Sequence, residues 1–205
     1  VISGTGTVFK LGTGTLTLTG VNTHTGGTTI REGALSIAAD ANLGDSSGGL
    51  TIDGGRLVTT ASFNSARAVS LEGGGGMGVG GVVDTAAATT LTLSGVVSGA
   101  GALTKAGAGT LTLTGTNTYT GGTTIIGGTL SIAADANLGN ASGGLTLDGG
   151  RLATTAGVSS ARAVSLGAGG GAFDTSNATT LTLTGVITGA GALTKTGSGT
   201  LQLTG

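Results

Sequence analysis

"LTLTGTNTYTGGTTI" occupies residues 111–125, and "LTLTGVNTHTGGTTI" stands 95 positions earlier, at residues 16–30. One of the two differences between these copies places His24 where the second copy has Tyr119. Each copy opens with leucines that alternate with threonines, a pattern that predicts a strand with one buried face. We interpret the stretch as one strand, one corner and the next strand of a coil.

The same offset of 95 continues downstream. Residues 33–71 align with 128–166, and 31 of these 39 positions are identical. The offset then falls to 90, because the glycine-rich residues 72–82 are replaced by the shorter segment 167–172. An insertion made almost wholly of glycine indicates a loop of variable length.

The end of the chain begins the pattern again. Residues 186–205 repeat 96–115, and both resemble the first twenty residues. The sequence therefore divides into repeats 1–95 and 96–185 and a partial repeat, 186–205. We expect residues 1–205 to form one continuous domain.

A shorter period runs inside each repeat. Leu103, Ile125, Leu147 and Leu166 lie 22, 22 and 19 residues apart, each in a short apolar run. Short strands at a period of about 20 residues are typical of a solenoid. A leucine-rich repeat would need a return segment and a regular asparagine, and the only helix-tolerant stretch, "AADANLG", is about one turn long. We predict an all-β fold, a right-handed, single-stranded parallel β-helix of about ten coils of ~20 residues.

This architecture predicts a column of aliphatic core residues and polar residues at the turns. Glycine, 46 of the 205 residues, is expected at the corners, and the absence of proline suits ladders that need every N–H donor. We expect the core to contain Leu16, Leu18, Leu111, Leu113, Ile125, Leu130, Ile132, Leu145, Leu147 and Leu166. We expect structural turns at Asn22, Asn117, Asp53 and Asp148.

Composition argues against several functional classes. The net charge is −1, with eight basic and nine acidic residues spread singly, so no basic surface for nucleic acid is expected. Mean hydropathy is +0.41, yet the longest apolar runs are far shorter than the ~20 residues of a spanning helix. The opening "VISGTGTVFK" lacks the pattern of a signal peptide, so we expect a secreted protein to be seen here without its leader.

The stretch "LTKAGAGTLTLTGTNTYTGGTTIIGGTLSI" (103–132) resembles the passenger-associated repeat of bacterial autotransporters. Its pattern is K-x-G-x-G-T-L-x-L-x-G-x-N-x-Y-x-G-x-T-x-I-x-x-G-x-L, which residues 9–37 follow with His24 in the Tyr position. A third copy begins at Leu193. The resemblance implies a secreted, β-helical passenger of a Gram-negative bacterium, displayed on the cell surface through an outer-membrane barrel, in which the repeat aids secretion and folding and often forms a stalk.

The single histidine, His24, is the first candidate for chemistry. Its counterpart is Tyr119, so we interpret the position as a side chain that covers the turn between the two strands. One histidine and no cysteine make a zinc site unexpected.

Acidic residues are the second candidates, because parallel β-helices also carry polysaccharide-cleaving sites built from aspartates and basic residues. Three aspartates of the first repeat recur in the second, as the pairs Asp40 and Asp135, Asp53 and Asp148, and Asp84 and Asp174. An active cleft is built once, whereas turn residues recur in every repeat. We therefore interpret the aspartates as structural, and the recurring pairs Arg56 with Arg67 and Arg151 with Arg162 as outer-face partners.

Calcium is a third possibility. Residues 73–85 and 167–175 are rich in glycine and each contain an aspartate, but neither shows the tandem nine-residue spacing of a calcium-binding repeat. We expect no metal and no cofactor.

The sequence thus predicts a non-enzymatic structural rod of a surface-displayed, extracellular protein, serving adhesion or self-association. Its expected partners are neighbouring β-helical coils of the same or another copy, and host or bacterial surface molecules. Two alternatives stay open: a filament unit that assembles end to end, since sheet edges at the ends of a solenoid promote association, and a polysaccharide-binding or polysaccharide-cleaving β-helix.

Overall fold

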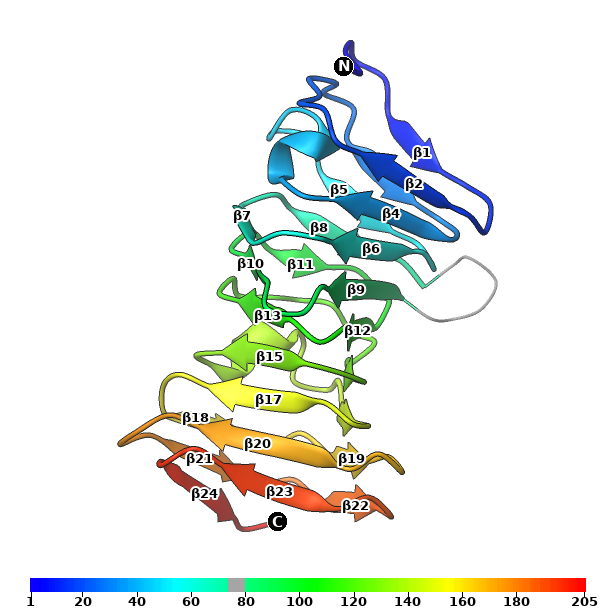
Figure 1. The fold of residues 1–205 in the computed structure, drawn as a ribbon. Coiled ribbons are helices and arrows are strands. Elements are labelled where there is room, and N and C mark those ends of the chain that lie inside the picture. Colours follow the sequence, from blue (N-terminus) through cyan, green and yellow to red (C-terminus); the bar gives the residue numbers. More distant parts are fainter. Residues whose placement is uncertain (74–79) are drawn as a thin grey trace.

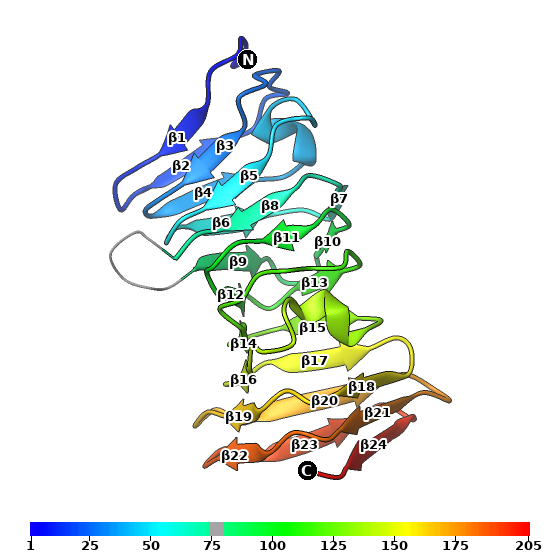
Figure 2. The same cartoon turned by 180° about the vertical axis from the view of Figure 1, so that it is seen from behind.

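The computed structural model describes residues 1–73 and 80–205, which form a column of stacked coils (Figure 1). The fold is an all-β parallel solenoid of about nine turns, which confirms the predicted fold class. The two termini lie at opposite ends of the column, and the view from behind shows the same stacking (Figure 2). Strands that pair in this described part run parallel, one coil apart in sequence.

Four sheets run along the column. The five-stranded sheet contains β1 (Val8–Lys10), β3 (Thr28–Ile30), β5 (Leu50–Ile52), β8 (Val69–Leu71) and β11 (Val97–Ser98). The nine-stranded sheet contains β2 (Thr15–Leu18), β4 (Ala34–Ile37), β6 (Arg56–Thr59), β9 (Gly81–Thr85), β12 (Leu103–Ala106), β14 (Thr123–Ile125), β16 (Leu145–Leu147), β19 (Val164–Leu166) and β22 (Ile187–Gly189). The seven-stranded sheet contains β7 (Phe63–Ser65), β10 (Thr90–Leu93), β13 (Thr110–Leu113), β15 (Thr129–Ile132), β17 (Arg151–Thr154), β20 (Gly171–Thr175) and β23 (Leu193–Thr196). The three-stranded sheet contains β18 (Val158–Ser160), β21 (Thr180–Leu183) and β24 (Thr200–Leu203).

Helical structure in the described residues is limited to two short 3₁₀ turns. They are η1 (Asp40–Leu43) and η2 (Asp135–Leu138), and both fall in the "AADANLG" stretches. Among these residues, no helix is long and apolar enough to cross a membrane.

In-register stacking of aliphatic side chains builds the core. Leu111 of β13 pairs with Leu91 in one neighbouring coil and Leu130 in the other, and all three are completely buried. Threonines between the leucines point outward, which explains the Leu-Thr alternation. Of the residues expected in the core, the buried ones are Leu18, Leu111, Leu113, Ile125, Leu130, Ile132, Leu145, Leu147 and Leu166. Leu16 is only partly buried, because β2 is the terminal strand of its sheet.

Equivalent strands of successive repeats lie on successive sheets. β1 belongs to the five-stranded sheet, its equivalent β12 to the nine-stranded sheet, and β23 to the seven-stranded sheet. The same shift takes β2, β13 and β24 through the nine-, seven- and three-stranded sheets. Each repeat therefore ends partway round the column, and the next copy of a given residue faces a different side.

Coil length is less uniform than the ~20 residues expected from sequence. Val69 of β8 pairs with Val97 of β11, 28 positions later, whereas Val8 pairs with Thr28 after 20. Longer coils reduce the number of turns, which accounts for about nine turns in place of ten.

We expect Leu111→Ala to lower the free energy of unfolding by about 2–5 kcal/mol, because it removes a side chain stacked on both faces by other leucines. Its neighbour Thr112 points outward, so Thr112→Ala is expected to change stability by about 0.5 kcal/mol or less. Denaturant unfolding of the two variants gives the comparison. Equal losses would contradict the assignment of an inner and an outer face.

Candidate functional site

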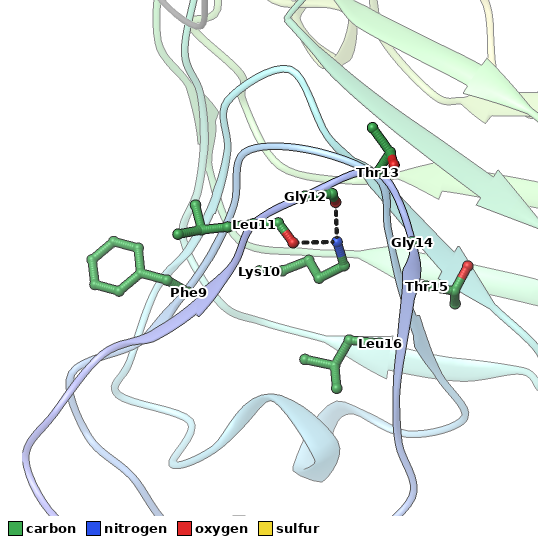
Figure 3. Close-up of a pocket in the computed structure, with 8 residues that line it drawn as sticks. All are labelled: Phe9, Lys10, Leu11, Gly12, Thr13, Gly14, Thr15 and Leu16. Atoms are coloured by element: carbon green, nitrogen blue, oxygen red, sulfur yellow. Dashed lines mark hydrogen bonds between the residues drawn. The ribbon is translucent and has the colours of Figure 1, made fainter.

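A buried lysine organises the first corner of each repeat. Figure 3 shows it in the first coil, where Lys10 Nζ donates to the carbonyl oxygens of Leu11 and Gly12. A third acceptor, the carbonyl of Glu32 at 3.0 Å, comes from the next coil. These bonds satisfy carbonyl groups that would otherwise be buried without a donor. The lysine thus ties its own turn to the following coil.

The second repeat has the same arrangement with deeper burial. Lys105 is completely buried, and its Nζ donates to the carbonyls of Ala106, Gly107 and Gly127. Gly107 has a φ of +72°, and a Cβ there would lie 2.1 Å from Asp84 Oδ1. The K-x-G spacing is therefore a steric and conformational requirement of this corner.

The environment of Lys105 lowers the pKa of its ammonium group. Burial lowers the pKa of Lys105 from 10.5 to about 8, and the carboxylate of Asp84 acts in the opposite direction. A lysine with this surrounding is a structural cation, since its donors are occupied by backbone oxygens.

The second corner contains the His24 and Tyr119 position. Both side chains are buried, with exposures of 1% and 0%, so the interpretation as a residue covering the turn is wrong. Tyr119 Oη lies 2.6 Å from Thr123 Oγ1, and His24 Nε2 lies 3.1 Å from Thr28 Oγ1. The residue fills the interior of the coil where no strand supplies a leucine.

A glycine opposite the ring makes room for it. A Cβ at Gly139, where φ is +80°, would lie 2.9 Å from two ring carbons of Tyr119. Burial raises the pKa of Tyr119 to about 12, and the hydrogen bond with Thr123 opposes this shift. In the first copy, His24 Nδ1 has no hydrogen-bond partner within the described part of the chain. The histidine therefore fills the site less completely than the tyrosine.

Asparagines join consecutive coils on the same side. Asn117 Oδ1 accepts a bond from the N–H of Val97 in the preceding coil, and its Nδ2 donates to the carbonyl of Asn137 in the following one. Asn22 makes the equivalent bonds to Ile2 and Asn42. Both asparagines predicted at turns thus bridge three coils.

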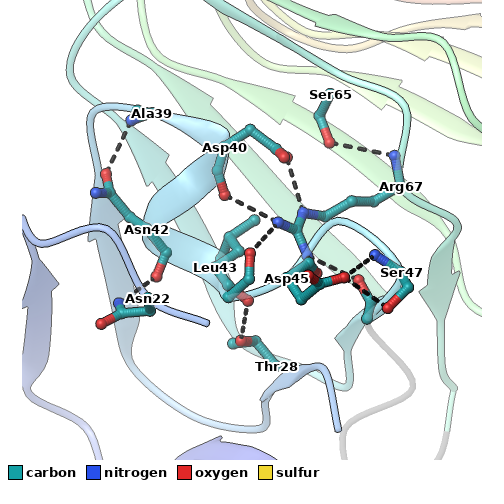
Figure 4. Close-up of polar contacts among 12 residues, drawn as sticks. Asn22, Thr28, Ala39, Asp40, Asn42, Leu43, Asp45, Ser47, Ser65 and Arg67 are labelled. Carbon is teal, nitrogen blue, oxygen red and sulfur yellow. Dashed lines mark hydrogen bonds and ion pairs between the residues drawn. The ribbon is translucent and has the colours of Figure 1, made fainter. Parts of the chain in front are cut away.

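A buried arginine anchors each loop that contains a 3₁₀ turn, a feature that the sequence did not suggest. Arg67 is 3% exposed, and its Nε donates to Asp40 Oδ1 at 2.8 Å (Figure 4). Its Nη atoms donate to four carbonyls of the loop, those of Asp40, Gly44, Asp45 and Gly48. The guanidinium is paired and hydrogen-bonded on all sides, as a buried charge requires.

Arg162 repeats this clamp in the second copy, where it pairs with Asp135. The assignment of Arg67 and Arg162 to the outer face is therefore wrong, because a charged side chain long enough to span one coil can be enclosed by the loop it bonds. Arg56 and Arg151 do lie on the outside, each half-exposed and paired with an aspartate, Asp84 or Asp174.

The remaining turn aspartates have different contacts. Asp148 Oδ1 accepts a bond of 2.7 Å from the N–H of Gly169 in the next coil. Asp53 Oδ2 lies 3.7 Å from Arg31 Nε. Asp148 thus links its turn to the next coil, whereas Asp53 lies near a single arginine.

The described residues contain no group of three His, Cys, Asp or Glu side chains that could hold a metal ion. The calcium alternative depended partly on residues 74–79, which lie outside the described part. Those glycine-rich segments contain two aspartates, Asp84 and Asp174. Each accepts a hydrogen bond from an arginine.

A family model described as passenger-associated-transport-repeat matches residues 8–37, 103–132 and 193–205. An adhesin BmaC autotransporter from Brucella suis biovar 1 (strain 1330) is 44% identical over 99 residues, which is 48% of this chain. The chain thus contains three segments that match the passenger-associated transport repeat, the last of them partial. The matched segments contain the corner lysine of all three copies, which is buried in the first two, and the His24 and Tyr119 position of the first two.

The chain spans about 3% of the length of the Brucella adhesin. No solved structure matches it.

Exchanging the residues of the His24 and Tyr119 position tests whether this side chain stabilises the coil from inside. We expect His24→Tyr to stabilise the protein by about 1 kcal/mol, because the ring nitrogen without a partner is removed and a hydroxyl reaches Thr28. Tyr119→His is the matched reverse change and is expected to destabilise it by a similar amount. Thermal or denaturant unfolding measures both, and a loss of stability from His24→Tyr would contradict the assignment.

The buried lysine predicts a stability that rises with pH. The pKa of Lys105 is about 8 in the folded state and near 10.5 when unfolded, so between these values the unfolded chain binds more protons. The free energy of unfolding is expected to increase as the pH is raised from 8 to 10, and Lys105→Met is expected to remove this increase.

Tyr119 provides a control at higher pH. Because the pKa of Tyr119 is raised from 10 to about 12, ionisation of the unfolded chain lowers stability above pH 10. Tyr119→Phe should abolish that loss without affecting the rise below pH 10. Denaturant unfolding across this range measures both, and a rise that persists in Lys105→Met would contradict the role of Lys105.

Proposed function

We propose that this chain is a stalk segment of a surface-displayed autotransporter, a structural rod that holds other parts of the protein away from the cell. The observation that carries the proposal is that the characteristic residues of the repeat make their hydrogen bonds inside the fold. Lys105, Asn117 and Tyr119 are buried and bonded within the fold. Residues used in this way support coils and are not free to contact a substrate.

We place the segment outside a Gram-negative cell, where it supports adhesion or self-association. The support is the similarity to a protein named as an adhesin autotransporter, together with the transport repeats. The geometry also suits a role in secretion and folding. Lys105 and Asn117 reach acceptors only 20 to 22 residues away, so a coil completes its bonds as soon as its neighbour is present.

A non-enzymatic role agrees with the positions of the aspartates. Asp40, Asp84, Asp135 and Asp174 each accept a bond from an arginine, and the first-repeat contacts recur in the second. Duplicated contacts of this kind stabilise loops and the outer sheet in both copies. The polysaccharide alternative has no comparable observation in its favour.

Lengthening the segment tests the stalk function. We expect insertion of a second copy of residues 96–185 after residue 185 to lengthen the rod by about 20 Å, four strand spacings. The inserted copy restores the natural junction because 186–205 repeats 96–115. Small-angle scattering of the purified segment measures the length.

The same insertion in the cell-surface protein should move an epitope placed on its outer side further from the cell. A glycine- and serine-rich insert of equal length serves as the control, since it adds no strand signal in circular dichroism. Two results together would contradict the stalk proposal: adhesion that is lost with outward substitutions such as Thr112→Ala, and adhesion that does not change with the length of the segment. They would show that the segment binds its target directly.

A further inference from the structure

The seven asparagines of the chain differ in the residues that follow them. Two of them open the tripeptides "NAS" at residues 140–142 and "NAT" at residues 177–179. Asn-x-Ser/Thr is the acceptor pattern of N-linked glycosylation, and it requires a position on the surface of the protein. The asparagines without Ser or Thr two positions later are Asn22, Asn42, Asn64, Asn117 and Asn137.

Burial divides the asparagines in nearly the same way. Asn140 and Asn177 are exposed. Four of the five without the pattern are buried, and their amide nitrogens donate to carbonyl groups inside the column. The fifth, Asn64, is exposed but is followed by Ser65 and Ala66. Both tripeptides thus lie where an enzyme can reach them.

The backbone of Asn140 is fixed from inside the column, whereas its side chain belongs to the surface. Its N–H donates to the carbonyl of Tyr119 at 2.9 Å, and its carbonyl accepts a bond of 2.6 Å from Arg162. Asn140 Oδ1 accepts bonds from the N–H and Oγ of Ser142, at 3.0 and 2.8 Å. Within the described residues, Asn140 Nδ2 has no hydrogen-bond partner. The turn therefore presents the amide nitrogen and the hydroxyl of the tripeptide together.

The second tripeptide lies in the turn between β20 and β21. The N–H and Oγ1 of Thr179 both donate to the carbonyl of Ser176, at 3.2 and 2.8 Å, which closes the turn. Ala178 has a φ of +58°, a conformation that residues other than glycine adopt at a cost in energy. Asn177 precedes it at the exposed tip of the turn, and no hydrogen bond engages its side chain in the described part of the chain.

The first repeat contains the same two turns without an amide nitrogen. Asp45 stands in place of Asn140, and its Oδ1 accepts the same two bonds from Ser47, at 2.9 and 2.7 Å (Figure 4). Ala87 stands in place of Asn177, and the following Ala88 has a φ of +60°. Both turns therefore form without an asparagine. The amide nitrogens of the second repeat are not required by the fold, and they remain available for chemistry.

We propose that Asn140 and Asn177 are acceptor sites for N-linked glycosylation by a glycosyltransferase of the producing cell. The donor is a sugar activated at its anomeric carbon by a phosphate, carried on a nucleotide or on a lipid. The asparagine Nδ2 forms a bond to the anomeric carbon as the bond from that carbon to the phosphate oxygen breaks. The phosphate group leaves with the electron pair, and Nδ2 loses one proton. The inference goes beyond the stalk function, which does not depend on it.

Both turns can carry a sugar without disturbing the stack of coils. Asn140 lies between η2 and β16, and Asn177 lies between β20 and β21, so neither belongs to a paired strand. Exposed turns of this kind are preferred sites of proteolytic cleavage. A hydrated sugar on each turn is expected to shield the column there.

Mass spectrometry of peptides from the protein, purified from the bacterium that produces it, tests the proposal. We expect sugar masses on the peptides that contain Asn140 and Asn177, and none on the peptide that contains the exposed control Asn64. Short adducts of variable length indicate stepwise transfer from nucleotide-activated sugars. One long oligosaccharide indicates transfer from a lipid carrier, and either adduct on the asparagine supports the proposal.

Matched variants test the tripeptide itself. Ser142→Ala removes the hydroxyl but keeps the amide, and it is expected to abolish modification of Asn140 while that of Asn177 persists. Asn140→Asp introduces the side chain that holds the same turn in the first repeat, and it is expected to have the same effect. Circular dichroism shows that each variant retains its strands.

The first repeat allows the reverse experiment. Asp45→Asn completes the tripeptide with Ser47 and is expected to add a modified site to a turn of the same geometry. Asp45→Asn combined with Ser47→Ala is the control, which lacks the hydroxyl and is expected to stay unmodified at residue 45.

Three results would overturn the proposal. They are Asn140 and Asn177 without sugar in the protein from its own bacterium, sugar that remains on Asn140 in the Ser142→Ala variant, and sugar found only on serine or threonine hydroxyls. Each of them leaves the measurement of rod length unaffected, so the failure of this inference is distinguishable from failure of the stalk function.

Discussion

Every coil of this solenoid must turn corners without leaving buried backbone carbonyls unpaired, and the structure depends on meeting this constraint. Long polar side chains meet it from inside. Lys105, Asn117 and Arg162 each donate to carbonyls in their own turn or in a neighbouring coil. Burying these groups is tolerable only because their donors are satisfied. The aliphatic columns can then stack in register between the corners.

The path of the repeat around the column determines which side of the column each loop faces. Equivalent strands move from one sheet to the next with each copy, so the loops anchored by Arg67 and Arg162 face different sides. A feature repeated in sequence is therefore not repeated along one face. This arrangement suits a rod whose duplicated residues hold its interior together.

Sequence reasoning reached the fold but not the interior of the corners. Alternation in "LTLTG" and the ~20-residue period predicted parallel stacked strands, because both patterns are set by local geometry. The placement of Arg67 and His24 was not predictable, since charge and polarity normally indicate the outside. Their partners Asp40 and Gly44 lie about 20 to 27 residues away and are brought close only by coiling.

By itself, the sequence determined the strand faces, the repeat boundaries and the family resemblance, all of which follow from periodicity and local motif. Only the tertiary structure decided which polar residues are buried and which carbonyls they reach. The physical reason is that a hydrogen bond such as Lys105 to Gly127 depends on the length of the intervening coil. Burial of these polar side chains arises when coils are stacked, and it cannot be read from one coil alone.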